Sequence, residues 1–254
     1  MKLESKHVVI TGGADGIGAA LARRFAAEGA RAVVVADIAE PASSVCDPIR
    51  FRQCDVTDRE QIRSLIETAE DLNGPIDLFC SNAGIIGGIG LHSSDDEWRR
   101  TIDVNVMAHV WAAQILIPKM IERGGGYLLN TASAAGLLTQ LGSATYSVTK
   151  HGAVGFAEWI AITYGDQGIK VSLLCPQAVR TNMTAGTDQG GVAGVDGMME
   201  PDAVADVVVA GLDAEQFLIL PHSEVAEYFR RKADDYERWL RGMRRLQERF
   251  PTGW

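Results

Sequence analysis

Short apolar runs and stretches of helical periodicity alternate along most of the chain. The runs are rich in β-branched residues and end at glycine or polar residues, which predicts buried strands. Their apolar character is continuous instead of alternating, as in parallel sheets that are covered on both faces. The predicted strands are Val8–Thr11, Ala32–Asp37, Ile49–Cys54, Ile76–Cys80, Tyr127–Thr131, Lys170–Cys175 and Phe217–Leu220.

The segments between these strands predict helices. Two open with the capping-box patterns Thr57-Asp58-Arg59-Glu60 and Ser94-Asp95-Asp96-Glu97, and the second of them runs past Gln114. The others cover Ile17–Glu28, Tyr146–Tyr164 and a stretch from Pro201 to near Gly211. Regular alternation of strands and helices predicts an α/β fold, a doubly wound parallel sheet with helices on both faces. Because no repeat or linker divides the chain, residues 1–254 are expected to form a single domain.

An extra helix is predicted beyond the last strand, over residues 222–250. Its apolar positions follow a 4-3 spacing that makes one stripe, with Lys232 at the one missing step. The stripe consists of Val225, Phe229, Tyr236, Trp239, Met243, Leu246 and Phe250. One continuous helix of this length, at about 1.5 Å per residue, would outrun one face of a domain. We therefore expect part of it to cross to a neighbouring subunit of a homodimer or homotetramer, near that subunit's substrate cleft. Packing on its own subunit is the alternative.

Composition narrows the possible functions. The net charge of −9 argues against binding to nucleic acid and to anionic membrane surfaces. No apolar stretch looks long enough to span a bilayer, and a strand that begins at Val8 leaves no room for a signal peptide. A cytoplasmic protein is expected. The four cysteines show no CxxC spacing and are expected to be free, with an isolated disulfide as the alternative. The histidines are scattered, so no metal site is predicted.

Tyr146 and Lys150 carry the main indication of chemistry. They stand four residues apart on a predicted helix and so share one face. A phenol titrates near about pH 10 and is a poor base at neutral pH, but a fixed ammonium beside it stabilises the phenolate. The pair therefore predicts a proton acceptor for an alcohol or a proton donor for a ketone. Taken alone, the same spacing also fits two neighbours on a helix surface.

A glycine-rich segment joins the first predicted strand to the first predicted helix. Gly12, Gly16 and Gly18 let the backbone approach a pyrophosphate at the start of that helix, although their spacing differs from the G-x-G-x-x-G pattern. Asp37 ends the second predicted strand, where an acid can accept hydrogen bonds from an adenosine ribose and repel a 2′-phosphate. No basic residue follows it in Ile38-Ala39-Glu40. This combination predicts NAD in preference to NADP.

The order of these motifs resembles that of the short-chain dehydrogenase/reductase family. The shared features are Thr-Gly-x3-Gly-x-Gly from Thr11, Asn82-Ala83-Gly84, Asn105, Ser133 and Tyr146-x3-Lys150. The resemblance implies a Rossmann-type fold and an NAD-dependent oxidoreductase that acts on a secondary alcohol or ketone. Two departures stand out. Ser81 stands where the family often has a second Asn, and Gln177 follows Pro176 where the family usually has Gly.

The resemblance also implies roles for particular residues. Tyr146 is the implied acid/base, and Lys150 the residue that holds the nicotinamide ribose and lowers the Tyr146 pKa. Ser133 is implied to bind the reacting oxygen, and Asn105 to hold a water on the proton path. Cofactor contacts are implied for Gly12, Asp15, Gly16, Ile17, Gly18, Asp37, Ile38, Asp55, Val56, Asn82, Ala83, Gly84, Tyr146, Lys150, Pro176, Val179, Thr181 and Met183.

Apolar residues near these motifs favour a hydrophobic substrate. They are Ile85, Ile86, Leu137, Leu138, Leu141 and Met183. The residues expected to orient the substrate are Ser133, Gln140, Ser143 and Gln177. The glycine-rich segment 182–200 is expected to be a mobile lid over it. A non-catalytic NAD sensor and a purely structural subunit are the alternatives, and the intact Ser133, Tyr146 and Lys150 favour the enzyme.

Overall fold

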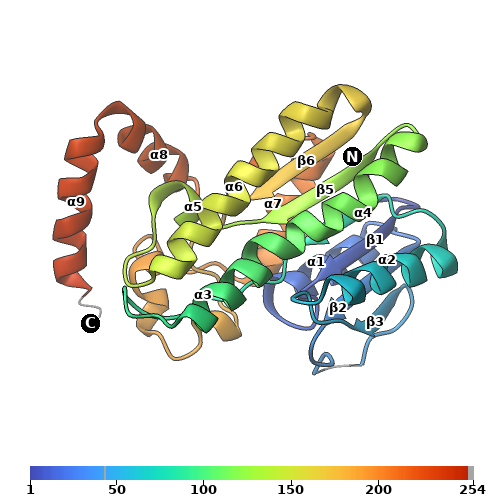
Figure 1. Cartoon of the computed structure of the whole chain (residues 1–254), viewed down its shortest axis with the longest axis horizontal. Coiled ribbons are helices and arrows are strands. Elements are labelled where there is room, and N and C mark those ends of the chain that lie inside the picture. Colours follow the sequence, from blue (N-terminus) through green and yellow to red (C-terminus); the bar gives the residue numbers. More distant parts are fainter. Residues whose placement is uncertain (43, 251–254) are drawn as a thin grey trace.

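The computed structural model describes residues 1–42 and 44–250, which build a parallel sheet at the centre of the molecule. Its strands are β1 (His7–Thr11), β2 (Ala32–Asp37), β3 (Ile49–Gln53), β4 (Leu78–Ser81), β5 (Gly126–Thr131), β6 (Ile169–Leu174) and β7 (Leu218–Ile219). Their order is β3-β2-β1-β4-β5-β6-β7, and every neighbouring pair is parallel (Figure 1). The predicted sheet is therefore confirmed. The order reverses between β1 and β4, where a crevice is expected outside the carboxyl ends of the strands.

Helices cover both faces of the sheet. On one face α1 (Gly16–Ala27) packs against α7 (Pro201–Asp213). On the other lie α2 (Arg59–Asn73), α4 (Ala108–Glu122) and α6 (Ala144–Tyr164) (Figure 1). Each face has its own apolar core, with Leu21 and Val208 in one and Ile66, Leu116 and Ala157 in the other. This arrangement confirms the doubly wound single domain.

The predicted long helix begins as expected but contains an irregular turn. Ser94 accepts a hydrogen bond from the Glu97 backbone while Glu97 bonds back to Ser94, so the capping box that starts α3 (Asp95–Ile102) is confirmed. A π-helical turn, Asp103–Met107, connects α3 to α4 and contains Asn105. The whole run Asp95–Glu122 is long and apolar enough to cross a membrane, contrary to our expectation. However, 56% of its most apolar 18-residue stretch is buried inside the fold. It serves as a core helix here.

Two predicted helix starts need correction. Asp58, not Thr57, caps α2: its carboxylate accepts from the backbone of Glu60 and Gln61, while the Thr57 hydroxyl donates to Asp55. A carboxylate at this position satisfies free N–H groups and also interacts favourably with the helix dipole. The helix that carries Tyr146 begins earlier than predicted, at Ala144, because Ser143 caps it.

The C-terminal extension is two helices, so the prediction of one continuous helix is wrong. α8 (Glu224–Asp234) and α9 (Tyr236–Arg249) meet at Asp235, which has φ −150° and ψ 91° and caps α9. Figure 1 shows α9 folding back beside α8 at the edge of the molecule. Lys232, the irregular step in the stripe, is buried and donates to the Leu137 carbonyl. The length argument for crossing to another subunit therefore fails.

The remaining elements are short. They are the helix α5 (Ala135–Leu138) and the 3-10 segments Gly165–Gln167, Asn182–Thr184 and Asp188–Gly194. All four cysteines are free; Cys46 is exposed and the other three are buried. The expectation of free thiols is therefore confirmed.

The α2 cap can be tested by its dependence on pH. Hydrogen bonds from Gln61 and Glu60 lower the pKa of Asp58, so its stabilising effect exists above the ordinary carboxyl range and is lost as the pH falls through the lowered pKa. Thermal unfolding followed by circular dichroism should show Asp58→Ala melting below wild type at about pH 7 and the gap closing towards about pH 3. Thr57→Ala is the control. A larger loss for Thr57→Ala would show that the cap is misassigned.

Candidate active site

A cavity of about 350 Å³ opens at the carboxyl ends of the central strands. All of the predicted cofactor residues except Gly18 line it, including Gly12, Asp37, Tyr146 and Lys150. A Cβ on Gly18 would stand 2.0 Å from the Gly12 carbonyl oxygen, so Gly18 serves the close packing of α1 on the loop. Several lining residues were missed from the sequence because no motif marks them: Cys54, Thr57, Arg100, Thr131 and Thr184.

The glycine loop is held tightly against the end of β4. Gly12 has φ +65°, and a Cβ there would lie 2.7 Å from the Ala83 Cα. The Asn82 side chain donates to the Gly12 carbonyl at 3.1 Å and accepts from the Thr131 hydroxyl at 3.1 Å. Asn82 thus joins the loop to β5. The first turn of α1, whose free N–H groups suit a phosphate, begins at this loop.

Two carboxylates are fixed along the β2–β3 side of the cavity. Asp37 accepts hydrogen bonds from the backbone of Ala14 at 3.1 Å and of Ile38 at 2.8 Å. Asp55 accepts from the Thr57 backbone at 2.9 Å and hydroxyl at 2.8 Å. Both acids are therefore preoriented. Arg100 of α3 adds a positive charge to the same cavity.

The predicted catalytic residues come together on the opposite side of the cavity. Tyr146 and Lys150 project from α6, with the Lys150 ammonium 5.6 Å from the centre of the Tyr146 ring. Ser133, just after β5, is buried, and its hydroxyl accepts from the Ala135 backbone at 3.1 Å. The Ser133 hydroxyl also donates to the Pro176 carbonyl at 3.4 Å, and it lies near enough to Tyr146 to lower the pKa of that phenol. The structure thus brings Ser133, Tyr146 and Lys150 to one place.

Burial works against the expected lowering of the Tyr146 pKa. Burial raises the pKa of Tyr146, and the Ser133 hydrogen bond opposes that rise only in part. The Lys150 ammonium lies beside the ring and donates to the Thr131 carbonyl at 3.1 Å. Burial also lowers the pKa of Lys150 to about 8, so at neutral pH most molecules keep the ammonium. A lowered Tyr146 pKa therefore stays a prediction.

Asn105 is buried in the π-helical turn with its side chain fully bonded. Its carbonyl oxygen accepts from the Ile85 backbone at 2.9 Å, and its amide donates to the Ile85 carbonyl at 2.9 Å and to the Thr149 hydroxyl at 3.0 Å. The side chain therefore ties the segment after β4 to α6. Asn105 does not itself line the described cavity, so its role on a proton path stays a prediction.

His109, for which no motif indicates a role, lies close to this group. It follows Asn105 by four residues and is buried, and within the described residues neither ring nitrogen has a hydrogen-bond partner. Burial and the charge of Lys150 lower its pKa to about 3. The imidazole is therefore neutral at physiological pH. The position of His109, four residues after Asn105, is the one sequence feature that could have indicated its place near the site.

A second cavity, of about 610 Å³, meets the first at Ser133 and Gln177, which line both. Gln140 also lines it, as expected for a substrate residue. Ser143 lines neither cavity. Its buried hydroxyl contacts the carbonyls of Ile86 and Gly88 and caps α6, so the structure gives it a structural role, and a substrate role stays a prediction.

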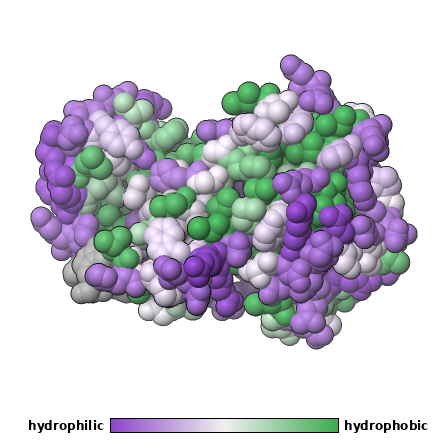
Figure 2. All heavy atoms as spheres, viewed as in Figure 1, coloured by the Kyte–Doolittle hydropathy of each residue, from purple (hydrophilic) through white to green (hydrophobic). Residues whose placement is uncertain are grey.

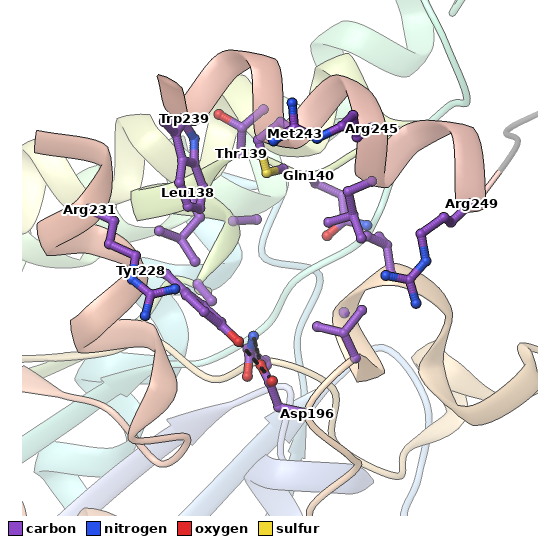
Figure 3. Close-up of a pocket in the computed structure, with 18 of the residues that line it drawn as sticks. Leu138, Thr139, Gln140, Asp196, Tyr228, Arg231, Trp239, Met243, Arg245 and Arg249 are labelled. Carbon is purple, nitrogen blue, oxygen red and sulfur yellow. Dashed lines mark hydrogen bonds between the residues drawn. The ribbon is translucent and has the colours of Figure 1, made fainter. Parts of the chain in front are cut away.

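The predicted lid and the C-terminal helices form the walls of this second cavity. Val192, Val195 and Asp196 line it from the lid segment, and Tyr228 lines it from α8. The Asp196 carboxylate accepts from the Tyr228 hydroxyl at 2.8 Å and from the Gln177 amide at 3.1 Å (Figure 3). The lid segment thus lies beside the cleft as predicted. Its mobility remains a prediction.

A cleft at the switch point of a parallel sheet, lined by a glycine loop and with a Ser–Tyr–Lys group beside it, is typical of a class of oxidoreductase. Similarity to known proteins supports the same class. The short chain dehydrogenase family model matches residues 6–190, and the chain belongs to that family. Among its relatives, 1-deoxy-11-beta-hydroxypentalenate dehydrogenase of Streptomyces exfoliatus is 33% identical over 247 residues, covering 92% of this chain and 90% of the relative.

Two further similarities are informative. Meso-2,3-butanediol dehydrogenase of Serratia marcescens is 35% identical over 196 residues, covering 74% of this chain and 77% of the relative. The crystal structure of a short-chain dehydrogenase/reductase from Burkholderia phymatum in complex with NAD has a TM-score of 0.81 at 26% identity. That match covers 93% of this chain and 96% of the other.

Proposed function

We propose that this oxidoreductase transfers a hydride between NAD(H) and a hydrophobic secondary alcohol or ketone. The observation that carries the proposal is the meeting of two cavities at Ser133. One is lined by the glycine loop, Asp37 and Lys150, and the other by apolar side chains such as Leu138 and Val195. Relatives named for a hydroxypentalenate and a butanediol support an alcohol as the reduced substrate.

Bound NAD would supply the hydride acceptor. The chain supplies the proton chemistry: the Ser133 hydroxyl and the Tyr146 phenolate bind the substrate hydroxyl, and the phenolate takes its proton as the hydride leaves, which gives the neutral phenol. The buried Lys150 ammonium favours the phenolate form that this step requires. In the reverse direction Tyr146 returns the proton to the ketone oxygen.

The glycine cradle and the acids fit such a cofactor. Any Cβ on Gly84 would stand 3.3 Å from the Lys150 ammonium, so the backbone there must stay bare for the cavity to remain open. The fixed Asp37 carboxylate suits a ribose diol, and its charge disfavours a 2′-phosphate of about −1.5 to −2 charges. These features support NAD in preference to NADP.

The assignment of Tyr146 as acid/base predicts a specific loss in Tyr146→Phe. Turnover should fall by at least ~100-fold because the phenyl ring cannot exchange a proton, while NADH affinity stays close to wild type. Absorbance of the reduced cofactor reports turnover, and a direct titration with NADH reports binding. Tyr127→Phe, which removes a buried hydroxyl bonded to Ser172 away from both cavities, is the control. Turnover of Tyr146→Phe within about tenfold of wild type contradicts the assignment.

The proposed cofactor preference depends on Asp37. Wild type should have the higher kcat/KM with NAD, and Asp37→Ala should shift the NAD-to-NADP ratio towards NADP by about tenfold or more, because it removes both the ribose acceptor and the repulsion. Glu40→Ala removes a nearby charge outside the cavity and should leave the ratio unchanged. A wild type that prefers NADP would overturn the proposal.

We further propose that the protein is a soluble cytoplasmic homo-oligomer whose subunits meet through the exposed face of α6. Val148, Trp159 and Ile162 lie on that helix at helical spacing and are 56%, 53% and 83% exposed. Figure 2 shows apolar side chains on this side of the molecule, over α4 and α6. A second copy presenting the same face would cover them.

The double variant Trp159→Glu with Ile162→Glu tests this interface. Charged side chains there should prevent the apolar contact, so light scattering should report a smaller particle than wild type, with unchanged circular dichroism. Leu72→Glu places a charge on an exposed apolar position of α2, 55% exposed, and serves as the control. If wild type is a monomer, or if the α6 double variant keeps the wild-type mass, the α6 interface is excluded.

A further inference from the structure

The outer wall of the 610 Å³ cavity is formed by α9, which touches the core only through the partly buried Trp239. No residue of α9 is buried, although Trp239, Met243 and Leu246 share one face and line the cavity. Figure 3 shows Trp239 and Met243 directed from α9 towards Leu138 and Gln140. An apolar helix face over a cavity of this size provides contacts for the apolar body of a ligand.

The same wall is strongly basic. Between Tyr236 and Arg249, α9 carries five arginines against two glutamates, in a chain of net charge −9. Arg238, Arg245 and Arg249 line the cavity, whereas Arg241 and Arg244 do not. In Figure 3 the Arg249 side chain reaches down towards the lid segment. Positive charge is therefore concentrated on the α9 wall of the cavity.

The acids that border the cavity are mostly engaged elsewhere. Asp196 accepts from Tyr228 and Gln177, and the Asp235 carboxylate caps α9 through the Arg238 backbone. Arg231 pairs with Glu227 at 2.8 Å. Within residues 1–42 and 44–250, Arg238, Arg245 and Arg249 form no ion pair with a carboxylate. These guanidinium groups remain available to a ligand.

We propose that the substrate carries a carboxylate at the end far from its reacting carbon, and that Arg245 and Arg249 bind this group. The inference rests on the proposed function, which places the reacting carbon at Ser133. The apolar face of α9 then contacts the part of the molecule between the two ends. A carboxylate fits better than a phosphate, because Asp234 and Asp235 line the same wall and repel a dianion more strongly, while a guanidinium pairs bidentately with a carboxylate.

The test compares a hydroxy acid with its uncharged methyl ester. The probes are dodecanoate bearing a hydroxyl on its penultimate carbon, and the methyl ester of that acid, each assayed for kcat/KM with NAD. Wild type should prefer the acid, and Arg245→Gln with Arg249→Gln should cut that preference by about tenfold, as expected for lost charge-assisted hydrogen bonds. Arg241→Gln with Arg244→Gln removes the same charge from the same helix outside the cavity and should keep the preference.

A binding measurement separates this inference from the proposed function. Unhydroxylated dodecanoate cannot be oxidised, but it should quench the fluorescence of Trp239, which lines the cavity. The quenching should be absent in Trp239→Phe, weaken with rising salt, and require about tenfold more ligand in the Arg245/Arg249 variant. If neither probe alcohol is oxidised but this pattern holds, the carboxylate site stands and the proposed reaction fails.

The opposite results would overturn the carboxylate site. The methyl ester could prove as good a substrate as the acid, or the Arg241/Arg244 control could lose as much preference as the cavity variant. In either case α9 affects the preference for the acid only through its net charge, or does not affect it at all. Arg245→Lys with Arg249→Lys, which keeps the charge but loses the planar fork, should retain part of the preference. Equal loss in the Lys and Gln variants would indicate a structural effect of substitution in α9.

Discussion

The site depends on holding one ammonium group, that of Lys150, inside the protein. Lys150 is 2% exposed and donates to the Thr131 carbonyl, and burial lowers its pKa to about 8. A buried charge is costly unless it is hydrogen-bonded, so the groups around it must stay in place. They do so by close backbone contact: a Cβ on Gly136 would stand 2.5 Å from the Lys150 carbonyl oxygen. That contact fixes α6 against the segment after β5, and with it the relation of Tyr146 to Ser133.

Periodicity and motif order were enough to predict the sheet, the helices on both faces and most of the residues that line the first cavity. They could not predict how the environment acts on those residues. The spacing of Tyr146 and Lys150 indicates that they are neighbours, but the desolvation that raises the Tyr146 pKa depends on what the whole fold packs around the ring. Ser143 and Gly18 illustrate the same limit. The sequence does not show that the Ser143 hydroxyl caps α6 or that Gly18 packs against the Gly12 carbonyl.

In the C-terminal extension, the spacing of apolar residues led to a wrong prediction for a different reason. An unbroken 4-3 stripe indicates one helix, and Lys232 looked like a single defect in it. The structure makes Lys232 the last inward residue of α8, bonded to the Leu137 carbonyl, before the chain turns at Asp235. Asp235 accepts from the Arg238 backbone, which is the N-cap signal that the sequence contained. Because the two short helices fold back, three members of the stripe, Trp239, Met243 and Leu246, face the molecule's own second cavity.

Gln177 links these parts of the molecule. It follows the β6 strand next to Pro176, lines both cavities, and donates from its side chain to Asp196 of the lid segment, which also binds Tyr228 of α8. Glycine, the usual residue of the family at this position, has no side chain with which to make that bond. The departure from the family pattern therefore coincides with the contact that holds the lid against the C-terminal helices. The predicted lid segment, bonded to α8, and the wall formed by α9 enclose the second cavity from two sides, so the C-terminal extension and Gln177 form one structural unit around the proposed substrate site.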